Sequence, residues 1–522
     1  MSVFWLVLGA LGLAAGYALQ VARWLRVLQR EHYEPASMLR FWRRWTWASA
    51  PTYARAALRR HFPFTLSYVL WCTFPVTLAL GLARVSVVPF VVGASIYGTL
   101  CPWGLSPRGR TGALQWTRRA RTLAEVGLLI SVLVVAVGLP LHEKLLFGAL
   151  AVWIVPFTLA AAAKVLTPWE SRLAGQFVDQ ATQRLARVHP TVVAITGSYG
   201  KTSTKNHVAD LLSGDGGVVA TPKSFNNRAG LSRAVNENLA DGTRVFVAEM
   251  GTYGPGEIRE LCEWCVPDVA VITAIGPVHL ERMKSLDVID AAKFEITERA
   301  RTVVINIDDP RLAQWPARLS QRVRTAGSVS VSADVRVAAQ GDEWHVWVDG
   351  EDVAQLAPLV GVQATNVACA VAAALEVGAL PRELPRRLSA IRAIANRATV
   401  ATAASGVVVV DDTFNANPAS ARASLEVLSA LTLSGRRVVV TPGLIELGVE
   451  QHDRNVELAR EVARRGFELA IVGRTNLAAL WVGYGGDARR FAVRDDAVAW
   501  VRESLMAGDG VLYLNDLPDQ YP

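Results

Sequence analysis

The 522-residue sequence predicts an α-helical membrane region of about five spans followed by two α/β domains. Long apolar runs fill the first third of the chain, and in the remainder buried-strand patterns alternate with helical patterns. A chain of this length exceeds the roughly 150 residues of an average domain, which also favours several domains. We expect a transmembrane region over residues 1–168, a connecting helix over 169–189, and α/β domains over 190–394 and 395–522.

The basic charge of the chain is confined to its N-terminal part. Residues 1–168 contain 17 Lys and Arg against 4 Asp and Glu, whereas residues 169–522 contain 37 against 42. We therefore expect no nucleic-acid partner, because the soluble-looking part is mildly acidic and has no basic stripe. Five cysteines without an even spacing argue against a disulfide framework. Cys262 and Cys265 lack two further ligands nearby, so we expect structural burial rather than a zinc site.

Five apolar runs are each long enough, or nearly so, to cross a hydrocarbon core of about 30 Å, which takes roughly 20 residues. They cover residues 3–22, 64–83, 86–105, 123–141 and 145–166. Basic residues follow the first run instead of preceding it, which is unlike a cleaved signal peptide. We therefore expect this run to remain in the mature protein.

Arginines concentrate between the first and second apolar runs and between the third and fourth. By the positive-inside tendency, the N-terminus would be outside and the α/β domains cytoplasmic. The predicted location is the inner (cytoplasmic) membrane, as a multi-pass protein in the lipid bilayer. Trp42, Trp45 and Trp47 among the first arginines suit an interfacial segment, with a solvated basic loop as the alternative.

A phosphate-binding loop is predicted where the first strand of the α/β part ends. The buried-strand pattern at 191–195 runs into T-G-S-Y-G-K-T-S-T at 196–204, and helical spacing follows. The glycines let backbone N–H groups approach phosphate oxygens, Lys201 would neutralise phosphate charge, and the Thr202 hydroxyl would ligate Mg²⁺. The eight-residue Walker pattern is not met, because Ile195 stands at its first glycine.

Further strands alternate with helices, which predicts mostly parallel sheets with ligands at the carboxyl ends of the strands. These strands cover residues 245–248, 269–273, 303–306, 407–410, 437–440 and 469–472. Polar residues follow the strands of the first domain, namely Glu249, His279, Asn306 and Asp309. Glu249 and His279 are candidate ligands of Mg²⁺ or water at the edge that carries the phosphate loop, although either alone is more commonly structural.

Nine motifs occur in one order along residues 190–455. They are T-G-x-x-G-K-T-S (196–203), S-F-N-N (224–227), E-M-G with P-G-E-I (249–258), G-P-V-H-L-E (276–281), A-K-F-E-I (292–296), N-I-D-D-P (306–310), T-N-V (365–367), D-D-T-F-N-A-N-P (411–418) and E-L-G (446–448). On these motifs the chain resembles the Mur ligase family, and most closely its D-alanyl-D-alanine-adding branch. The resemblance implies a P-loop central ATP-binding domain and a Rossmann-like C-terminal domain.

The resemblance also implies an ATP-dependent amide ligase of peptidoglycan or cell-envelope precursor synthesis, with ATP and Mg²⁺ as cofactors. In the family, ATP phosphorylates a substrate carboxylate to an acyl phosphate, which an incoming amine attacks to form an amide. The partners implied are a sugar-peptide acceptor, lipid-linked or UDP-linked, and an amino acid or dipeptide. Mg²⁺ and Lys201 would offset charge as the γ-phosphoryl group moves.

Site residues carry over from the family one position at a time. Those implied to bind the nucleotide are Gly197, Ser198, Gly200, Lys201, Thr202, Ser203, Asn306, Asn366, Arg397, Asp411 and Asp412. Thr202 and Glu249 would ligate a first Mg²⁺ and His279 a second. Lys293 would be a carbamylated lysine beside the metal, with a plain surface lysine as the alternative; together with Lys201 and His279 it would be catalytic. The substrate-facing positions would be Ser224, Asn226, Asn227, Asn415 and Asn417.

The sequence departs from the family pattern in four places. Residues 365–369 replace His-Asn-x-x-Asn, residues 441–444 replace Gly-Asp-Met, and residues 513–522 replace Lys-Gly-Ser-Arg, so the identity of the amine stays open. The apolar runs stand where the family has an N-terminal domain that grips the UDP-sugar. This last departure motivates the hypothesis of a lipid-linked acceptor.

Three other functions compete with a ligase. A catalytically idle Mur-like scaffold would bind nucleotide and recruit envelope enzymes, but it would have no need for Lys201, Thr202, Glu249, His279 and Lys293 together. An ATP-driven transporter is disfavoured because the apolar runs carry almost no charge to mark a substrate path. A related branch that amidates lipid-linked stem peptides carries a four-cysteine metal insert, which this sequence lacks.

Overall fold

The computed structural model describes residues 3–31, 33–47, 62–83, 85–102, 105, 107, 113–137, 140, 144–222, 225–278, 280–359, 361–392, 399–413 and 416–515. The chain divides into two compact units, one formed by the residues up to Arg172 and the other by Leu173–Asp516. Each unit has its own hydrophobic packing.

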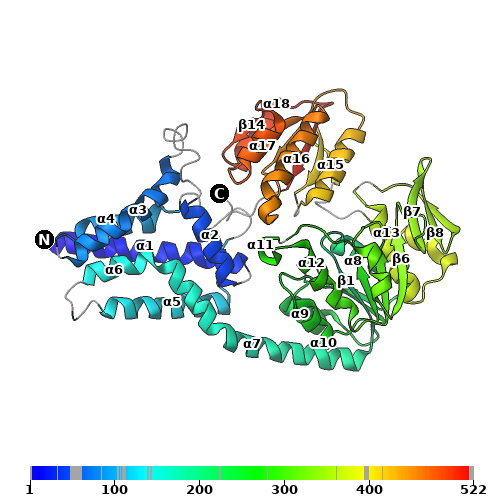
Figure 1. Ribbon diagram of the computed structural model, residues 1–522, viewed down its shortest axis with the longest axis horizontal. Helices are drawn as coiled ribbons and strands as arrows, with labels where there is room; N and C mark the ends of the chain where they lie inside the picture. The colour runs from blue at the N-terminus through cyan, green and yellow to red at the C-terminus, as the bar shows by residue number, and fades with distance from the viewer. Residues whose placement is uncertain are drawn as a thin grey trace. The chain divides into compact units, whose positions relative to one another are not determined.

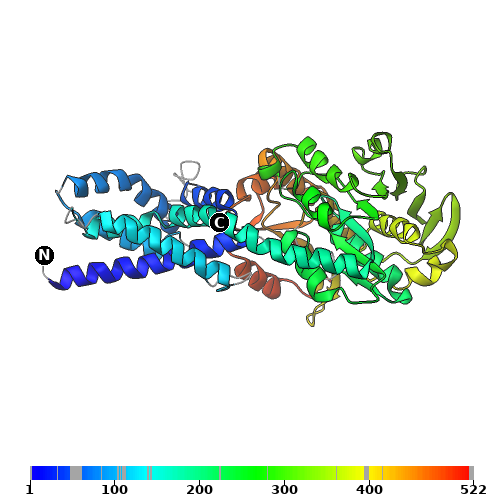
Figure 2. The same cartoon turned by 90° about the horizontal axis from the view of Figure 1, so that it is seen from below.

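In the described part of the first unit, all regular secondary structure is helical (Figure 1 and Figure 2). Its helices are α1 (Val3–Arg30), α2 (Pro35–Trp47), α3 (Phe62–Leu82), α4 (Val88–Leu100), α5 (Arg118–Val137), α6 (Lys144–Trp153) and the first half of α7 (Val155–Val188). Each of the five apolar runs therefore contains a helix. The expected connecting helix is the continuation of α7, which ends in the second unit.

The prediction of about five membrane spans is not confirmed. Among the described residues, α5 alone has the length and hydropathy of a span, and α6 with α7 adds a second if this pair, bent by 69°, is one broken span. The 13 residues of α4 rise only about 20 Å, which is short of a hydrocarbon core of about 30 Å. The apolar stretch Val69–Leu82 of α3 is equally short.

Close backbone contact between α1 and α4 organises the core of the helical unit. A Cβ atom on Gly98 would lie 2.6 Å from the Cα of Gly16, so only glycine permits this crossing. Beside the crossing, Gln20 Nε2 and Arg23 Nη1 donate to the carbonyl oxygen of Cys101 at 2.6 and 2.8 Å. These two side chains therefore cap the last turn of α4, whose carbonyls have no partner within the helix.

The second unit begins with a nine-stranded sheet in the order β2-β3-β1-β4-β5-β6-β7-β8-β9. Neighbouring strands from β2 to β7 are parallel, and β8 and β9 pair antiparallel at one edge. The strands are β1 (Thr191–Thr196), β2 (Val218–Ala220), β3 (Val245–Glu249), β4 (Val269–Ile272), β5 (Thr302–Asn306), β6 (Arg322–Gly327), β7 (Val335–Gln340), β8 (Glu343–Val348) and β9 (Glu351–Leu356).

Helices cover both faces of this sheet and bury nearly continuous valine, isoleucine and alanine strands. One core contains α8 (Lys201–Leu212), α13 (Ala364–Glu376) and α14 (Leu384–Leu388). The other contains the end of α7 with α9 (Arg228–Asn238), α10 (Glu257–Trp264) and α12 (Leu286–Phe294). Cys262 and Cys265 lie in this second core, as the expectation of structural burial requires.

A six-stranded sheet in the order β10-β11-β15-β12-β13-β14 follows. Its strands are β10 (Thr399–Thr402), β11 (Val408–Asp412), β12 (Arg437–Thr441), β13 (Glu468–Val472), β14 (Arg489–Phe491) and β15 (Gly510–Leu514), all parallel except β10. One core holds α15 (Pro418–Ala430), α16 (Gln451–Arg464) and α17 (Leu477–Tyr484), and the other holds α18 (Arg494–Ser504). The two α/β folds and all seven predicted strands are thus confirmed. The sequence interpretation missed the central strand β15.

We predict that Gly98→Ala destabilises the helical unit by roughly 1–3 kcal/mol, because the added methyl group would displace the α1 backbone. Gly93→Ala in the same helix is the matched control. Its Cβ would meet only Trp153 at 3.8 Å, so the better helix propensity of alanine should leave it neutral or stabilising. Thermal unfolding followed by tryptophan fluorescence compares the two. Equal midpoints would contradict the glycine crossing.

Candidate active site

The phosphate loop joins β1 to α8 through two glycines that no other residue replaces without strain. Gly197 and Gly200 have φ angles of +150° and +79°. A Cβ atom on Gly197 would clash with Thr273 Oγ1, and one on Gly200 with Asn366 Oδ1. The loop is therefore held close to both neighbours, while its backbone and the start of α8 keep the geometry that binds phosphate.

Lys201 and Thr202 begin α8 at this loop. Lys201 Nζ donates to the carbonyl oxygen of Gly197 at 2.7 Å, so the ammonium folds back over the loop. The Thr202 hydroxyl donates to Glu249 Oε2 at 2.9 Å. Glu249 is the last residue of β3, which pairs directly with β1. Parallel pairing of two strand ends therefore brings the threonine and the carboxylate together from 47 residues apart in the sequence.

The carboxylate of Glu249 is fully buried and surrounded by donors. Besides Thr202, Asn226 Nδ2 donates to its Oε1 at 3.1 Å, and Lys205 Nζ lies 3.5 Å from its Oε2. Lys205 is itself buried and donates to the carbonyl oxygen of Thr221 at 2.8 Å. Sequence reasoning missed Lys205, although its position one helical turn after Thr202 places both on the same side of α8.

Lys293 lies in the last turn of α12 with 2 % of its surface exposed. Among the described residues, none hydrogen-bonds or forms an ion pair with its ammonium. Burial, followed by the positive charge of Lys201, lowers its pKa well below the ordinary value, while Glu257, Glu249 and Glu295 act against the shift. The structure thus places Lys293 inside the domain near the P-loop, and not on the surface.

The other residues predicted to bind nucleotide lie in the phosphate loop or contact the strand ends and helices next to it. Ser198 Oγ accepts from the N–H of Gly276 at 2.9 Å, and Ser203 is buried in the first turn of α8. Asn306 Nδ2 donates to the carbonyl oxygen of Thr273 at 2.7 Å, which ties the ends of β5 and β4 together. Asn366 begins α13 and lies against the phosphate loop at Gly200.

Several predicted positions have structural roles of their own. Asn227 Oδ1 accepts from Gly230 N at 2.9 Å and caps α9, and Asn417 Oδ1 caps α15 through the N–H groups of Ala419 and Ser420 at 3.0 Å. Asp411 and Asp412 are consecutive in β11 and so point to opposite faces of the sheet. Asp412 Oδ2 accepts from Ser424 of α15 at 2.7 Å, whereas Asp411 lines a cavity under α18. The structure does not bring this pair together.

Four predicted site residues lie outside the described residues: His279, Ser224, Arg397 and Asn415. The motifs G-P-V-H-L-E and E-L-G are in contact, because Leu280 N donates to the carbonyl oxygen of Glu446 at 2.9 Å. Within the described residues, Thr202 and Glu249 remain the potential metal ligands, and no cluster of three His, Cys, Asp or Glu side chains is present there. A threonine hydroxyl and a carboxylate are oxygen donors of the kind Mg²⁺ prefers.

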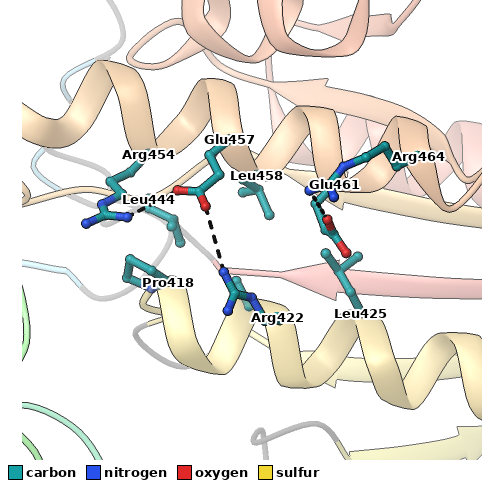
Figure 3. A pocket seen from close by; sticks show the side chains of 10 residues that line it. Pro418, Arg422, Leu425, Leu444, Arg454, Glu457, Leu458, Glu461 and Arg464 are labelled. Carbon is teal, nitrogen blue, oxygen red and sulfur yellow. Dashed lines mark hydrogen bonds and ion pairs between the residues drawn. The ribbon is translucent and has the colours of Figure 1, made fainter. Parts of the chain in front are cut away.

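Two cavities in the C-terminal α/β domain are distinct from the phosphate loop. The one between α15 and α16, of about 60 Å³, is crossed by the ion pairs of Arg454 and Arg422 with Glu457 at 3.1 and 3.7 Å (Figure 3). This volume is far below the roughly 300 Å³ at which small-molecule sites begin. The other, of about 370 Å³, lies between β11, β15 and α18 and includes Asp411, Arg502 and Tyr513.

A buried histidine stands in the helix that carries Lys201 and Thr202. His207 is 1 % exposed, and in the described part of the chain neither of its ring nitrogens has a hydrogen-bond partner. Burial lowers the pKa of His207 to about 4. The burial of His207 could not be predicted from the sequence, because α8 packs against helices from distant parts of the domain.

The domain that carries the phosphate loop is similar to known proteins. The Mur ligase middle domain family matches residues 195–374. The UDP-N-acetylmuramoyl-tripeptide–D-alanyl-D-alanine ligase of Mycobacterium tuberculosis is 32% identical over 364 residues, which cover 62% of this chain and 69% of the relative. The ligase of the same name from Bacillus subtilis is 29% identical over 276 residues, with 51% and 60% covered.

Solved structures show the same fold. MurF from Acinetobacter baumannii has a TM-score of 0.58 at 23% identity and covers 66% of this chain and 77% of its own. MurF from Thermotoga maritima in complex with ADP has a TM-score of 0.58 at 24% identity, with 66% and 80% covered. At this identity, the likeness concerns the fold alone.

Fold and site together define an ATP-dependent ligase built on a phosphate-binding α/β domain, with ATP and Mg²⁺ as its cofactors. The chain belongs to the Mur ligase family, and within that family it is MurF-like.

We predict that His207 makes the folded protein sensitive to acid. Because its folded pKa of about 4 lies below the ordinary 6.5, the unfolded chain binds a proton that the folded chain rejects between these values. The free energy of unfolding is therefore fully retained above about pH 6.5, and it falls by up to about 3 kcal/mol as the pH approaches 4. His207→Leu should reduce this loss in thermal unfolding midpoints measured from pH 7 to 4. An unchanged pH dependence would contradict the assignment.

Proposed function

We propose that this protein is a membrane-anchored amide ligase that extends the peptide of a cell-envelope precursor through an acyl phosphate intermediate. The observation that carries the proposal is the contact of Thr202 with Glu249 beside Lys201 and the buried Lys293. The two-step chemistry of the family needs a phosphate loop, two oxygen ligands for the metal and a buried lysine close together.

The chain's own residues account for the first step. One oxygen of the acceptor carboxylate attacks the γ-phosphorus of ATP, the bond to the β-phosphate oxygen breaks, and ADP leaves. Backbone N–H groups at Gly197 and Gly200 and the Lys201 ammonium would hold the phosphates and stabilise charge on the transferring group. Thr202 and Glu249 would hold Mg²⁺, which when bound offsets phosphate charge.

In the second step, the amine nitrogen of an amino acid or dipeptide attacks the acyl carbon, phosphate departs and the nitrogen loses a proton. Lys293 would serve as a carbamate. Its burial keeps the amine neutral, and the neutral amine is the form that adds to CO₂. The product would carry a negative charge and so offset the nearby positive charge of Lys201.

The proposed membrane anchor is the helical unit. On α5, five large apolar side chains are between 49 and 59% exposed, namely Leu128, Leu129, Val132, Leu133 and Val137. Apolar side chains exposed along successive turns are costly in water and favourable in hydrocarbon. With the arginine distribution, this supports an inner-membrane protein whose N-terminus is outside and whose ligase domains are cytoplasmic.

The proposed acceptor is a lipid-linked sugar-peptide, because the apolar helices stand where the family has its UDP-sugar domain. The UDP-linked muramoyl-tripeptide in the names of the relatives is the alternative acceptor, and D-alanyl-D-alanine in those names is the first amine to try. The helical unit would hold the ligase domains at the surface where a lipid-linked acceptor resides.

The test is phosphate release from Mg-ATP by the detergent-purified full chain, with UDP-linked and lipid-linked acceptors combined in turn with amino acids and D-alanyl-D-alanine. We expect release only when acceptor and amine are both present, and faster with the lipid-linked acceptor. Lys201→Ala should reduce turnover by on the order of 10²-fold or more, because one preorganised charge toward the phosphates is lost.

Other outcomes separate the alternatives. Equal or better use of the UDP-linked acceptor would overturn the lipid-linked assignment and leave the ligase intact. ATP binding without release across the whole panel would identify a scaffold. Undiminished ligation by Lys201→Ala would remove the phosphate-loop role.

The role of Lys293 leads to a separate prediction. Lys293→Ala should abolish most ligation, and small carboxylates such as formate or acetate should restore part of it by supplying the lost negative charge. Lys284→Ala, at an exposed lysine in the same region, is the control and should behave like the parent protein. A fully active Lys293→Ala protein would exclude the carbamate.

A further inference from the structure

The carboxylate of Glu295 caps a helix that it does not belong to. Glu295 follows α12 directly and is 3 % exposed. Its Oε1 accepts from the N–H of Gly256 at 2.6 Å, and its Oε2 accepts from the N–H of Arg259 at 3.1 Å. Both donors lie at the start of α10, where the first N–H groups of a helix lack internal partners and where the dipole favours negative charge.

The start of α10 has no cap of its own. Its N-cap residue is Gly256, with φ +90° and no side chain to accept a hydrogen bond. The glycine turns the chain into the helix, and Glu295 supplies the missing acceptor from 39 residues away. The motifs P-G-E-I and A-K-F-E-I, which are separate in the sequence, are therefore two halves of one contact.

This contact joins the two segments that carry the predicted metal-side groups. Residues 250–256 connect Glu249 to the start of α10, which Glu295 caps. Lys293 precedes Glu295 by two residues in the sequence. Glu257, the first residue of α10, accepts from Tyr253 N at 2.7 Å and lies within electrostatic range of Lys293. Fixing the start of α10 to the end of α12 therefore fixes Glu249, Glu257 and Lys293 relative to one another.

We propose that Glu295 is a positioning residue of the ligase reaction, which acts by holding Lys293 at its place relative to Glu249 and the start of α10. This inference rests on the proposed function. The two hydrogen bonds of the Glu295 carboxylate come from backbone N–H groups, one to each oxygen, so both oxygens must accept. The Arg259 guanidinium also lies 3.9 Å from Oε1 as an ion pair. Glutamine offers one acceptor and turns an NH₂ group toward the other donor, so one N–H of α10 loses its partner and the cap rotates.

The chain offers a matched control in Glu298. Its carboxylate also pairs with α10, through two hydrogen bonds of 2.7 Å to the Arg259 side chain, but it is exposed and contacts no backbone group. An exposed ion pair contributes little even when its geometry is good. Glu298→Gln thus removes a carboxylate from the same helix start without altering the cap.

The experiment measures kcat, the KM for ATP and the Mg²⁺ concentration for half-maximal ligation, at a temperature well below the unfolding midpoint of each full-length variant. Glu295→Gln should lower kcat by about 10- to 100-fold and raise the required Mg²⁺ concentration, as loss of a residue that orients a metal site does. Glu298→Gln should stay within about twofold. In the Lys293→Ala background, Glu295→Gln should add little further loss, because its effect passes through Lys293.

Three results would overturn the inference. These are parent-like kinetics of Glu295→Gln, a loss that disappears on cooling and so reflects stability alone, and full additivity of Glu295→Gln with Lys293→Ala. If the parent protein itself does not ligate, the proposed function fails and the positioning role of Glu295 fails with it. A protein that ligates and tolerates Glu295→Gln retains the function without the positioning role.

Discussion

The site depends on one buried carboxylate, that of Glu249. Its oxygens accept from a threonine of α8 and an asparagine of the loop before α9, and a buried ammonium of α8 neutralises it. A charge enclosed in this way is costly to bury alone, so it persists only because its partners converge on it. The P-loop helix, the S-F-N-N segment and the end of β3 are therefore coupled through Glu249. A change in any of them would alter the position of the predicted metal ligands.

Tight packing also fixes the segment that follows Glu249. Gly251, which follows the buried carboxylate, donates to the carbonyl oxygen of Asn226 at 2.7 Å, and a Cβ there would lie 2.8 Å from the Asn226 side chain. Glu295 then fixes the start of α10. Gly251 and Glu295, which belong to the motifs, thus have packing roles that are separate from catalysis and that nevertheless set the positions of the catalytic groups.

The helical unit and the α/β unit pack their apolar side chains in different ways. The α/β sheets bury β-branched strands between helices, as parallel sheets require. The helical unit instead brings helices together through glycines and aromatic rings, with Tyr97 and Trp153 stacked at 4.4 Å, and leaves large apolar side chains on its surface. Apolar composition alone does not reveal where helices end, as at residue 100, or bend, as between α6 and α7, and for this reason about five spans are not confirmed among the described residues.

The sequence by itself determined the α/β class, the phosphate loop and the order of the motifs. Strand patterns and glycine positions are local properties, and seven strands could be located from them. Only the tertiary structure decided that Lys205 neutralises Glu249, that Glu295 caps α10, that His207 is buried and that Asp412 faces α15 while Asp411 lines a cavity under α18. Each of these depends on residues distant in the sequence or on the direction in which a strand faces its neighbours, and neither is recorded in local spacing.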